Sequence, residues 1–101
     1  LAARMQSADA NDFLYQFDAS RDYDPSGALD RITAPALYIN SADDQVNPPE
    51  LTLAETYART MPKTTFILLP ISEQTRGHGT HSLPAVWGGY LRDFLATLPE
   101  R

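Results

Sequence analysis

Two short apolar runs stand out along the chain, at residues 36–41 and 65–69. The first is Ala-Leu-Tyr-Ile-Asn-Ser, and the second, Thr-Phe-Ile-Leu-Leu, shows almost no polar alternation. Near-continuous apolar runs of this length are typical of parallel strands that are covered on both faces. We therefore predict two strands of a parallel sheet.

The N-terminal part of the chain is predicted to be helical over residues 8–18. Phe13 and Phe17 stand four positions apart there, as they would on one face of a helix. Either Asp9 or Asn11 can serve as the N-cap of this helix, because both side chains accept hydrogen bonds from backbone N–H groups.

The segment between the two strands carries strong helix-start signals. Asn47 is the predicted N-cap, Pro48 and Pro49 fall at the first helical positions, and Glu50 can complete a capping box. The helix is expected to end at Met61, since a proline follows it.

A last helix is predicted from about residue 84 to residue 98, with a wide apolar face that needs a large surface to pack on. The order helix–strand–helix–strand–helix places residues 1–101 in the α/β class, as a single partial domain. A two-stranded sheet alone is marginally stable at best. We therefore expect two parallel strands of a larger sheet, completed by polypeptide outside this chain.

Composition and charge narrow the range of functions. With 101 residues, 43% of them hydrophobic, the chain suits one soluble domain that buries roughly 65% of its unfolded surface. A net charge of −5 argues against nucleic acid or an anionic membrane as partner. The chain has no cysteine, which excludes disulfides, thiolate metal sites and a cysteine nucleophile. The cytoplasm is the default expectation for its compartment.

Polar residues follow each predicted strand. Asp43 and Asp44 come just after the first strand, and the pair Gly77-His78 follows the second, with His78 34 positions beyond Asp44. Ligands of open parallel sheets bind at the carboxyl ends of the strands, where both loops should lie. A histidine base needs a proton acceptor on its far nitrogen, which Asp44 can provide. The pair suits the last two members of a nucleophile–His–acid triad.

Other assignments stay open. Asp43 can replace Asp44 as the acid, and His81 can compete with His78. These four residues also have the types of a zinc site, although His-x-x-His on a glycine-rich loop lacks the fixed geometry of helical motifs. A solvated turn aspartate and a surface histidine are the non-functional alternatives, and Arg76 is more readily explained as a solvated loop residue than as an anion contact.

Several segments resemble enzymes of the α/β-hydrolase fold, and within them homoserine O-acetyltransferases. Residues 32–50 are similar to the segment of that subgroup in which Ile-x-Ala-Pro-x-Leu-x-Ile precedes the catalytic acid, and three residues separate the acid from a following Pro-Pro-Glu. Asp44 occupies the position of the acid, and Gly77-His78 matches the Gly-His of the family. Residues 9–15 resemble the segment that leaves the helical lid.

The resemblance implies that residues 1–31 form a helical segment after the lid, and that residues 32–101 form the last two strands and helices of the core. It also implies an acyl-enzyme mechanism, in which His78 activates a serine and Asp44 orients the ring. The implied partner is a small acyl substrate, with acetyl-CoA as donor in an acetyltransferase and no resident cofactor or metal. Gly79 replaces the aspartate that homoserine acetyltransferases usually carry, so transferase and ester hydrolase stay open.

No Gly-x-Ser-x-Gly occurs in the chain, so the nucleophile is expected in the missing N-terminal half of the same protein. Alone, the chain is expected to be inactive. Two other hypotheses are a non-catalytic binding or interaction module that keeps the scaffold without the chemistry, and a small metal-binding domain. A homo-oligomer is left open.

Overall fold

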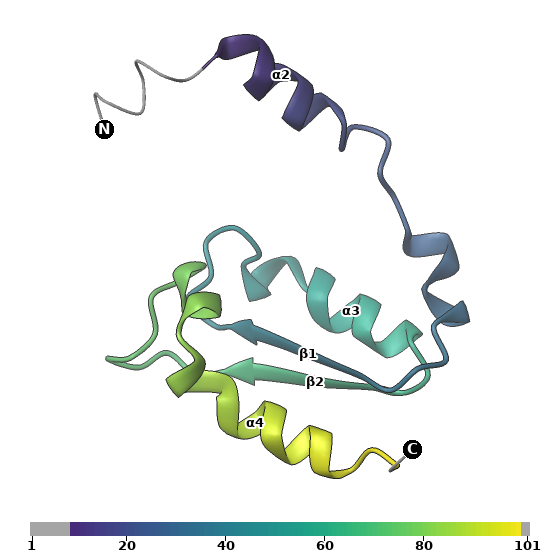
Figure 1. The fold of residues 1–101 in the computed structure, drawn as a ribbon, viewed down its shortest axis with the longest axis vertical. Coiled ribbons are helices and arrows are strands. Elements are labelled where there is room, and N and C mark those ends of the chain that lie inside the picture. The colour runs from purple at the N-terminus through teal and green to yellow at the C-terminus, as the bar shows by residue number, and fades with distance from the viewer. Residues whose placement is uncertain (1–8, 100–101) are drawn as a thin grey trace.

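The computed structural model describes residues 9–99, which form a mixed α/β arrangement in the predicted order (Figure 1). Two parallel strands lie between helices, and short 3₁₀ turns complete the connections. The helices and strands are α2 (Ala10–Asp18), β1 (Ala36–Ser41), α3 (Leu53–Thr60), β2 (Thr64–Leu69) and α4 (Pro84–Ala96). The 3₁₀ turns are Ser26–Arg31, Pro49–Leu51 and Gly79–Ser82.

Helix α2 begins at one of the two N-cap residues that the sequence offered. Asp9 is the N-cap, and its Oδ1 accepts a hydrogen bond of 2.7 Å from the amide of Asn11. The helix ends at Asp18 as predicted, while residue 8 lies outside the described residues. Its apolar stripe is bare, with Phe13 53% and Phe17 71% exposed, and Figure 1 shows α2 standing apart from the sheet.

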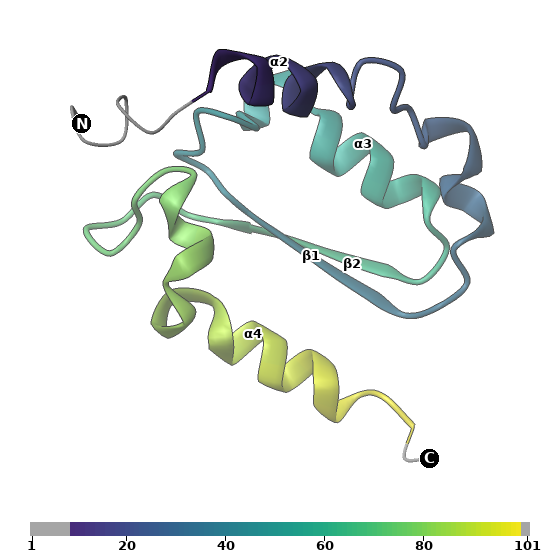
Figure 2. The same ribbon diagram turned by 45° about the horizontal axis from the view of Figure 1, so that its top comes forward.

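The sheet sets the position of both loops that carry the candidate site residues. Strand β1 has the predicted bounds and β2 begins one residue early; they pair in parallel, with Ala36 opposite Thr64 and Ser41 opposite Leu69. Helix α3 covers one face and α4 lies on the other, as Figures 1 and 2 both show. Because the strands run in the same direction, the loops that follow them lie at one end of the sheet.

The helix between the strands starts later than predicted. Pro49–Leu51 form a separate 3₁₀ turn, Thr52 adopts a φ of 55°, and α3 begins only at Leu53. Pro48 is followed by another proline, which disfavours helical ψ, and its ψ is 138°. It therefore cannot be the first helical residue, and the prediction of Asn47 as N-cap is wrong.

Helices α3 and α4 leave apolar surface uncovered. The buried residues of α3 are Ala54 and Ala58, whereas Tyr57 of the same helix is exposed. Helix α4 begins at Pro84 as predicted and ends two residues early, and none of its residues is buried. In the described part of the chain, no helix is both long and apolar enough to cross a membrane.

Residues 9–99 bury little apolar surface among themselves. Their buried apolar residues are only Ala54, Ala58 and Leu69. The accessible surface is 8260 Å², whereas a compact chain of this mass exposes about 5,700 Å² and an unfolded one about 16,000 Å². The radius of gyration is 17.0 Å, against about 13 Å for a compact domain. The chain thus buries about half of its unfolded surface, and the expectation of 65% is wrong.

Candidate active site

Asp44 and His78 meet beyond the carboxyl ends of β1 and β2. His78 Nδ1 lies 3.1 Å from Asp44 Oδ2 and 3.2 Å from Asp44 Oδ1. A carboxylate only accepts hydrogen bonds, so a neutral ring in this contact carries its proton on Nδ1 and keeps Nε2 as an acceptor. Within residues 9–99, the His78 ring is hydrogen-bonded to Asp44 alone. The structure therefore brings together the two residues that sequence reasoning paired.

The turn after β1 is built around the carboxylate of Asp44. Its Oδ1 accepts hydrogen bonds from the amides of Val46 at 2.8 Å and Asn47 at 3.1 Å. The residue is only 8% exposed. Burial acts to raise the pKa of Asp44, but the amides of Asn47 and Val46, together with His78, outweigh it and hold the pKa below its ordinary value. Asp44 is therefore an anion at neutral pH.

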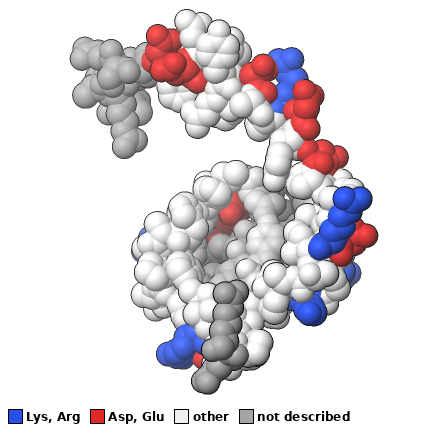
Figure 3. All heavy atoms as spheres, turned by 45° about the vertical axis from the view of Figure 1, so that its right-hand side comes forward, with Lys and Arg blue, Asp and Glu red and all other residues white. Residues whose placement is uncertain are grey.

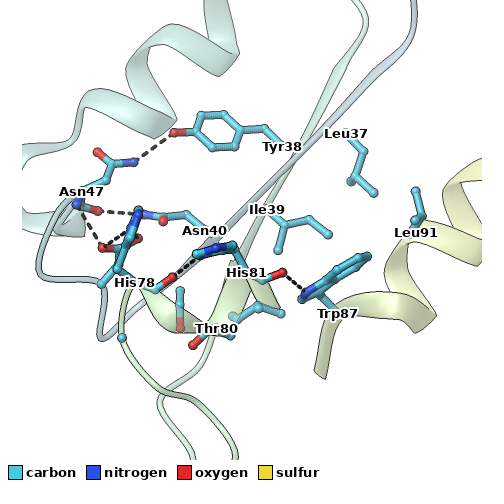
Figure 4. Close-up of a pocket in the computed structure, with 14 residues that line it drawn as sticks. Leu37, Tyr38, Ile39, Asn40, Asn47, His78, Thr80, His81, Trp87 and Leu91 are labelled. Atoms are coloured by element: carbon cyan, nitrogen blue, oxygen red, sulfur yellow. Dashed lines mark hydrogen bonds and ion pairs between the residues drawn. The ribbon is translucent and has the colours of Figure 1, made fainter. Parts of the chain in front are cut away.

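Side chains of β1 form hydrogen bonds with this turn (Figure 4). The Asn47 amide group donates to the Tyr38 hydroxyl at 2.9 Å, and the buried Asn40 donates to the carbonyl of Asn47 at 2.9 Å. Asn47 in turn donates its backbone N–H to Asp44. A chain of hydrogen bonds thus links the strand to the acid.

Asp43 has a different role from its neighbour. Its Oδ1 accepts from the Ser41 hydroxyl at 2.5 Å, and its Oδ2 accepts from the Gly77 amide at 3.0 Å. The Ser41 hydroxyl, followed by the Gly77 amide, lowers the pKa of Asp43 to about 2. Of the two aspartates that the sequence offered, the structure places Asp44 against the His78 ring.

The loop that carries His78 is fixed by its own hydrogen bonds. Thr80 is 2% exposed, and its hydroxyl oxygen accepts from the Arg76 amide at 2.8 Å. The Thr80 amide donates to the Gly77 carbonyl at 3.0 Å. The His78 side chain, by contrast, is 50% exposed. The ring is accessible to a reacting group while its backbone is held.

His81 and Arg76, the other candidates on this loop, bond to the main chain. The His81 ring donates from Nδ1 to the His78 carbonyl at 2.6 Å. The Arg76 guanidinium donates to the carbonyls of Glu73 and Thr75, both at 2.6 Å. Among residues 9–99 no group of three or more histidine or acidic side chains is arranged to hold a metal ion.

A cavity of about 460 Å³ connects the pair to the sheet. It follows β1 from Leu37 to Ser41, reaches Asp44 and His78 at one end, and is bordered by α4 at Trp87 (Figure 4). Figure 3 shows the hollow with acidic atoms inside it. Trp87, predicted as core, is instead only half-buried and lines this cavity, with its Nε1 donating to a main-chain carbonyl.

Four further residues of the site were not predicted from the sequence to be site residues. Gln45 and Asn47 lie in the acid's turn, Asn40 lies at the end of β1, and Thr80 follows His78. Gln45 and Asn47 belong to a run of polar residues directly after a predicted strand, and that run is a signal by which they could have been found. A polar residue inside an apolar strand marks Asn40, whereas Thr80 has no such signal.

The fold and the site together define a mixed α/β chain with an acid–histidine pair at the ends of adjacent parallel strands. Comparison with known proteins found no matching family model, and no curated protein or solved structure matches the chain. A functional hypothesis therefore rests on the geometry of this pair and on the resemblance of residues 32–50.

Proposed function

We propose that the chain supplies the acid and the base of a nucleophile–His–acid triad in an acyl-transfer or ester-hydrolysis enzyme. It would form the C-terminal part of an α/β-hydrolase fold. The observation that supports this most directly is the contact of 3.1 Å between His78 Nδ1 and Asp44 Oδ2. Its location fits, because both residues follow adjacent parallel strands, where open sheets place their sites.

In the proposed reaction, a serine hydroxyl attacks the acyl carbonyl carbon while its proton passes to His78 Nε2. The imidazolium returns that proton to the leaving alcohol or thiol as the tetrahedral intermediate collapses to an acyl-serine. Water or an acceptor hydroxyl then attacks the acyl-serine, gives its proton to Nε2, and the serine oxygen regains it. Asp44, whose pKa is lowered, stays ionised and stabilises the imidazolium.

The acyl donor and acceptor follow from the class of reaction. The substrate is a small acyl compound, which would be acetyl-CoA in an acetyltransferase and a carboxylic ester in a hydrolase. The two activities differ in whether a second hydroxyl or water reaches the acyl-serine. Gly79 follows His78 at the position where a carboxylate would bind a substrate amine. The proposal therefore includes both acyl acceptors, a substrate hydroxyl and water.

The uncovered surface of residues 9–99 supports the view that the sheet continues in further polypeptide. In the described sheet β1 pairs only with β2, so one edge of β1 is unpaired. The cavity follows this strand along residues 37–41. The accessible surface of the chain exceeds that of a compact chain of the same mass by about 2,500 Å². This excess is larger than the roughly 800 Å² that one partner buries in a standard protein–protein interface. A self-contained binding module would cover its own apolar faces.

The test of this proposal uses the complete protein that contains this chain. His78→Ala and Asp44→Asn should each lower kcat for a short-chain aryl ester or for acetyl-CoA by about 10⁴-fold. Asp93→Asn is the matched control for Asp44→Asn, because Asp93 is an exposed residue of α4. This control should keep nearly normal kcat.

A second measurement looks for the nucleophile directly. A fluorophosphonate should label one serine of the complete protein, and His78→Ala should slow this labelling as strongly as it slows turnover. Full activity in both His78→Ala and Asp44→Asn would reject the proposal, as would an upstream sequence without a nucleophile-elbow serine.

A further inference from the structure

Three consecutive residues of the β1 loop each bind the same dipeptide of the β2 loop. Asp43 Oδ2 accepts from the Gly77 amide at 3.0 Å, and Gln45 Oε1 accepts from the His78 amide at 3.1 Å. Between them, Asp44 holds the His78 ring. The two loops are separated by 34 positions in sequence, so these contacts fix how they approach each other.

The acceptor on Asp43 is itself held in place. The buried Ser41, the last residue of β1, donates its hydroxyl to the other oxygen of that carboxylate at 2.5 Å. One carboxylate therefore ties the end of β1 to the Gly77 amide. Hydrogen bonds to an ionised acceptor are shorter and stronger than neutral ones, so this link is the stiffer of the two.

Gly77 is the residue that lets the loops come this close. Its φ is 56°, in the left-handed region. A Cβ at this position would lie 2.4 Å from Gln45 Oε1 and 3.1 Å from the Asp43 carbonyl oxygen. Only glycine avoids both the backbone strain and the contact with Gln45.

The backbone contacts matter because the ring has few others. With half of its side chain exposed, His78 is not held by packing, and its ring can rotate about two bonds. Gln45 holds the amide of His78, and Asp43 holds the amide of Gly77. Together these contacts set the direction of the Cα–Cβ bond that carries the imidazole. The ring then reaches Asp44 without having to be buried.

We propose that Asp43 and Gln45 are positioning residues, whose side-chain oxygens hold the Gly77-His78 backbone so that the imidazole stays on Asp44. Their effect on turnover rests on the proposed function. Their effect on the imidazole is a property of this chain's own residues and does not depend on it.

The experiment compares variants that remove an acceptor with variants that keep one, in the complete protein. Asp43→Leu and Gln45→Met remove the accepting oxygen at similar side-chain size. Asp43→Asn and Gln45→Glu keep an oxygen that can accept from the same amide. Gln74→Ala is the matched control on the same loop, since its exposed side chain makes no hydrogen bond among the described residues.

Two readouts are measured on every variant. Nitrogen-15 NMR of the His78 ring reports the fraction protonated at Nδ1, and steady-state kinetics separate kcat from KM. We expect Asp43→Leu and Gln45→Met to lower the Nδ1-protonated fraction and to lower kcat about 10- to 100-fold at nearly constant KM. Asp43→Asn and Gln45→Glu should retain most of both.

The outcomes separate this inference from the proposed function. Wild-type ring shifts in Asp43→Leu and Gln45→Met would overturn it, and so would equal losses in the acceptor-keeping and acceptor-removing pairs. Altered ring shifts with rescue by Asp43→Asn and Gln45→Glu would support it even in a protein without acyl-transfer activity. Unchanged turnover in His78→Ala would instead reject the proposed function alone.

Discussion

The hydroxyl of Tyr38 accepts a hydrogen bond of 2.9 Å from the side chain of Asn47, nine positions further along the chain. Tyr38 lies in the middle of β1, and Asn47 closes the turn that presents Asp44. The contact therefore ties the orientation of the acid to the strand rather than to the turn alone. The ring of Tyr38 also packs edge-on against Phe66 of β2, at 5.6 Å between centroids.

Tyr38→Phe should loosen the acid's turn without disturbing the sheet. The substitution removes the acceptor for Asn47 and keeps the contact with Phe66, so we expect a loss of about 1 kcal/mol in the free energy of unfolding. Chemical denaturation of the complete protein measures it. Tyr57→Phe is the control, because the Tyr57 hydroxyl makes no hydrogen bond among the described residues. Equal losses in both variants would contradict the role assigned to Asn47.

Stability should fall in acid through the carboxylates of the β1 loop. The pKa of Asp43 is lowered from 3.8 to about 2, and that of Asp44 is also lowered. The unfolded chain therefore binds more protons than the folded one between about pH 4 and pH 2, so stability present above pH 4 is lost as the pH falls.

Denaturant midpoints measured from pH 5 to pH 2 test this expectation. Asp43→Asn should flatten the pH dependence relative to wild type. Parallel curves for wild type and Asp43→Asn would show that Asp43 does not contribute.

Sequence reasoning succeeded where one local rule decides the outcome. The bounds of β1 and the approach of the two polar loops follow from an apolar run and the direction of parallel strands, and the capping rule restricts the N-cap of α2 to Asp9 or Asn11. The choice between Asp43 and Asp44 is different, because two identical adjacent side chains leave a turn in directions set by its dihedral angles. The hydrogen bonds to Gly77 and His78 settle it only in three dimensions.

Gly77→Ala should be the most damaging small substitution in the site. A methyl group at this position meets both a positive φ and the Gln45 oxygen at 2.4 Å, so we expect a cost of about 1 to 3 kcal/mol and a drop in kcat. Gly27→Ala is the matched control, since a Cβ there meets nothing within 4 Å.

A double variant separates the two causes. Adding Gln45→Ala to Gly77→Ala relieves the contact but leaves the backbone strain, so part of the stability should return while kcat stays low. Thermal unfolding and kinetics of the single and double variants provide the measurement. Wild-type stability in Gly77→Ala would show that the loop has a second arrangement.

The 101-residue chain produced alone should not behave as a cooperative monomer. Only three residues, Ala54, Ala58 and Leu69, are buried and apolar in the described part, which is far from a stabilising core. Size-exclusion chromatography and thermal circular dichroism should show association or a broad, shallow transition. A monomer with a sharp transition would contradict the inference that the sheet continues elsewhere.

The errors in the sequence predictions have two physical origins. Helix rules placed α3 too early because they treated Pro48 alone and not as a residue before Pro49, although its extended ψ of 138° follows from that neighbour. The helix face that carries Phe13 and Phe17 needs a surface to pack on, which these residues do not find within residues 9–99. Apolar periodicity predicts which face of a helix is suited to burial. Whether that face is buried depends on whether another element packs against it.

The unpaired edge of β1 makes this chain suited to two-fragment reconstitution. Backbone N–H and C=O groups along one side of Ala36–Ser41 can be satisfied by an added extended segment, and the turn holding the acid begins right after Ser41. Under the proposed function, the polypeptide that adds a strand beside β1 also carries the nucleophile, so both would reach the site together. Under the proposed function, this chain and the polypeptide that completes its sheet are each inactive alone. Mixing them should restore turnover, so catalytic activity would report their association.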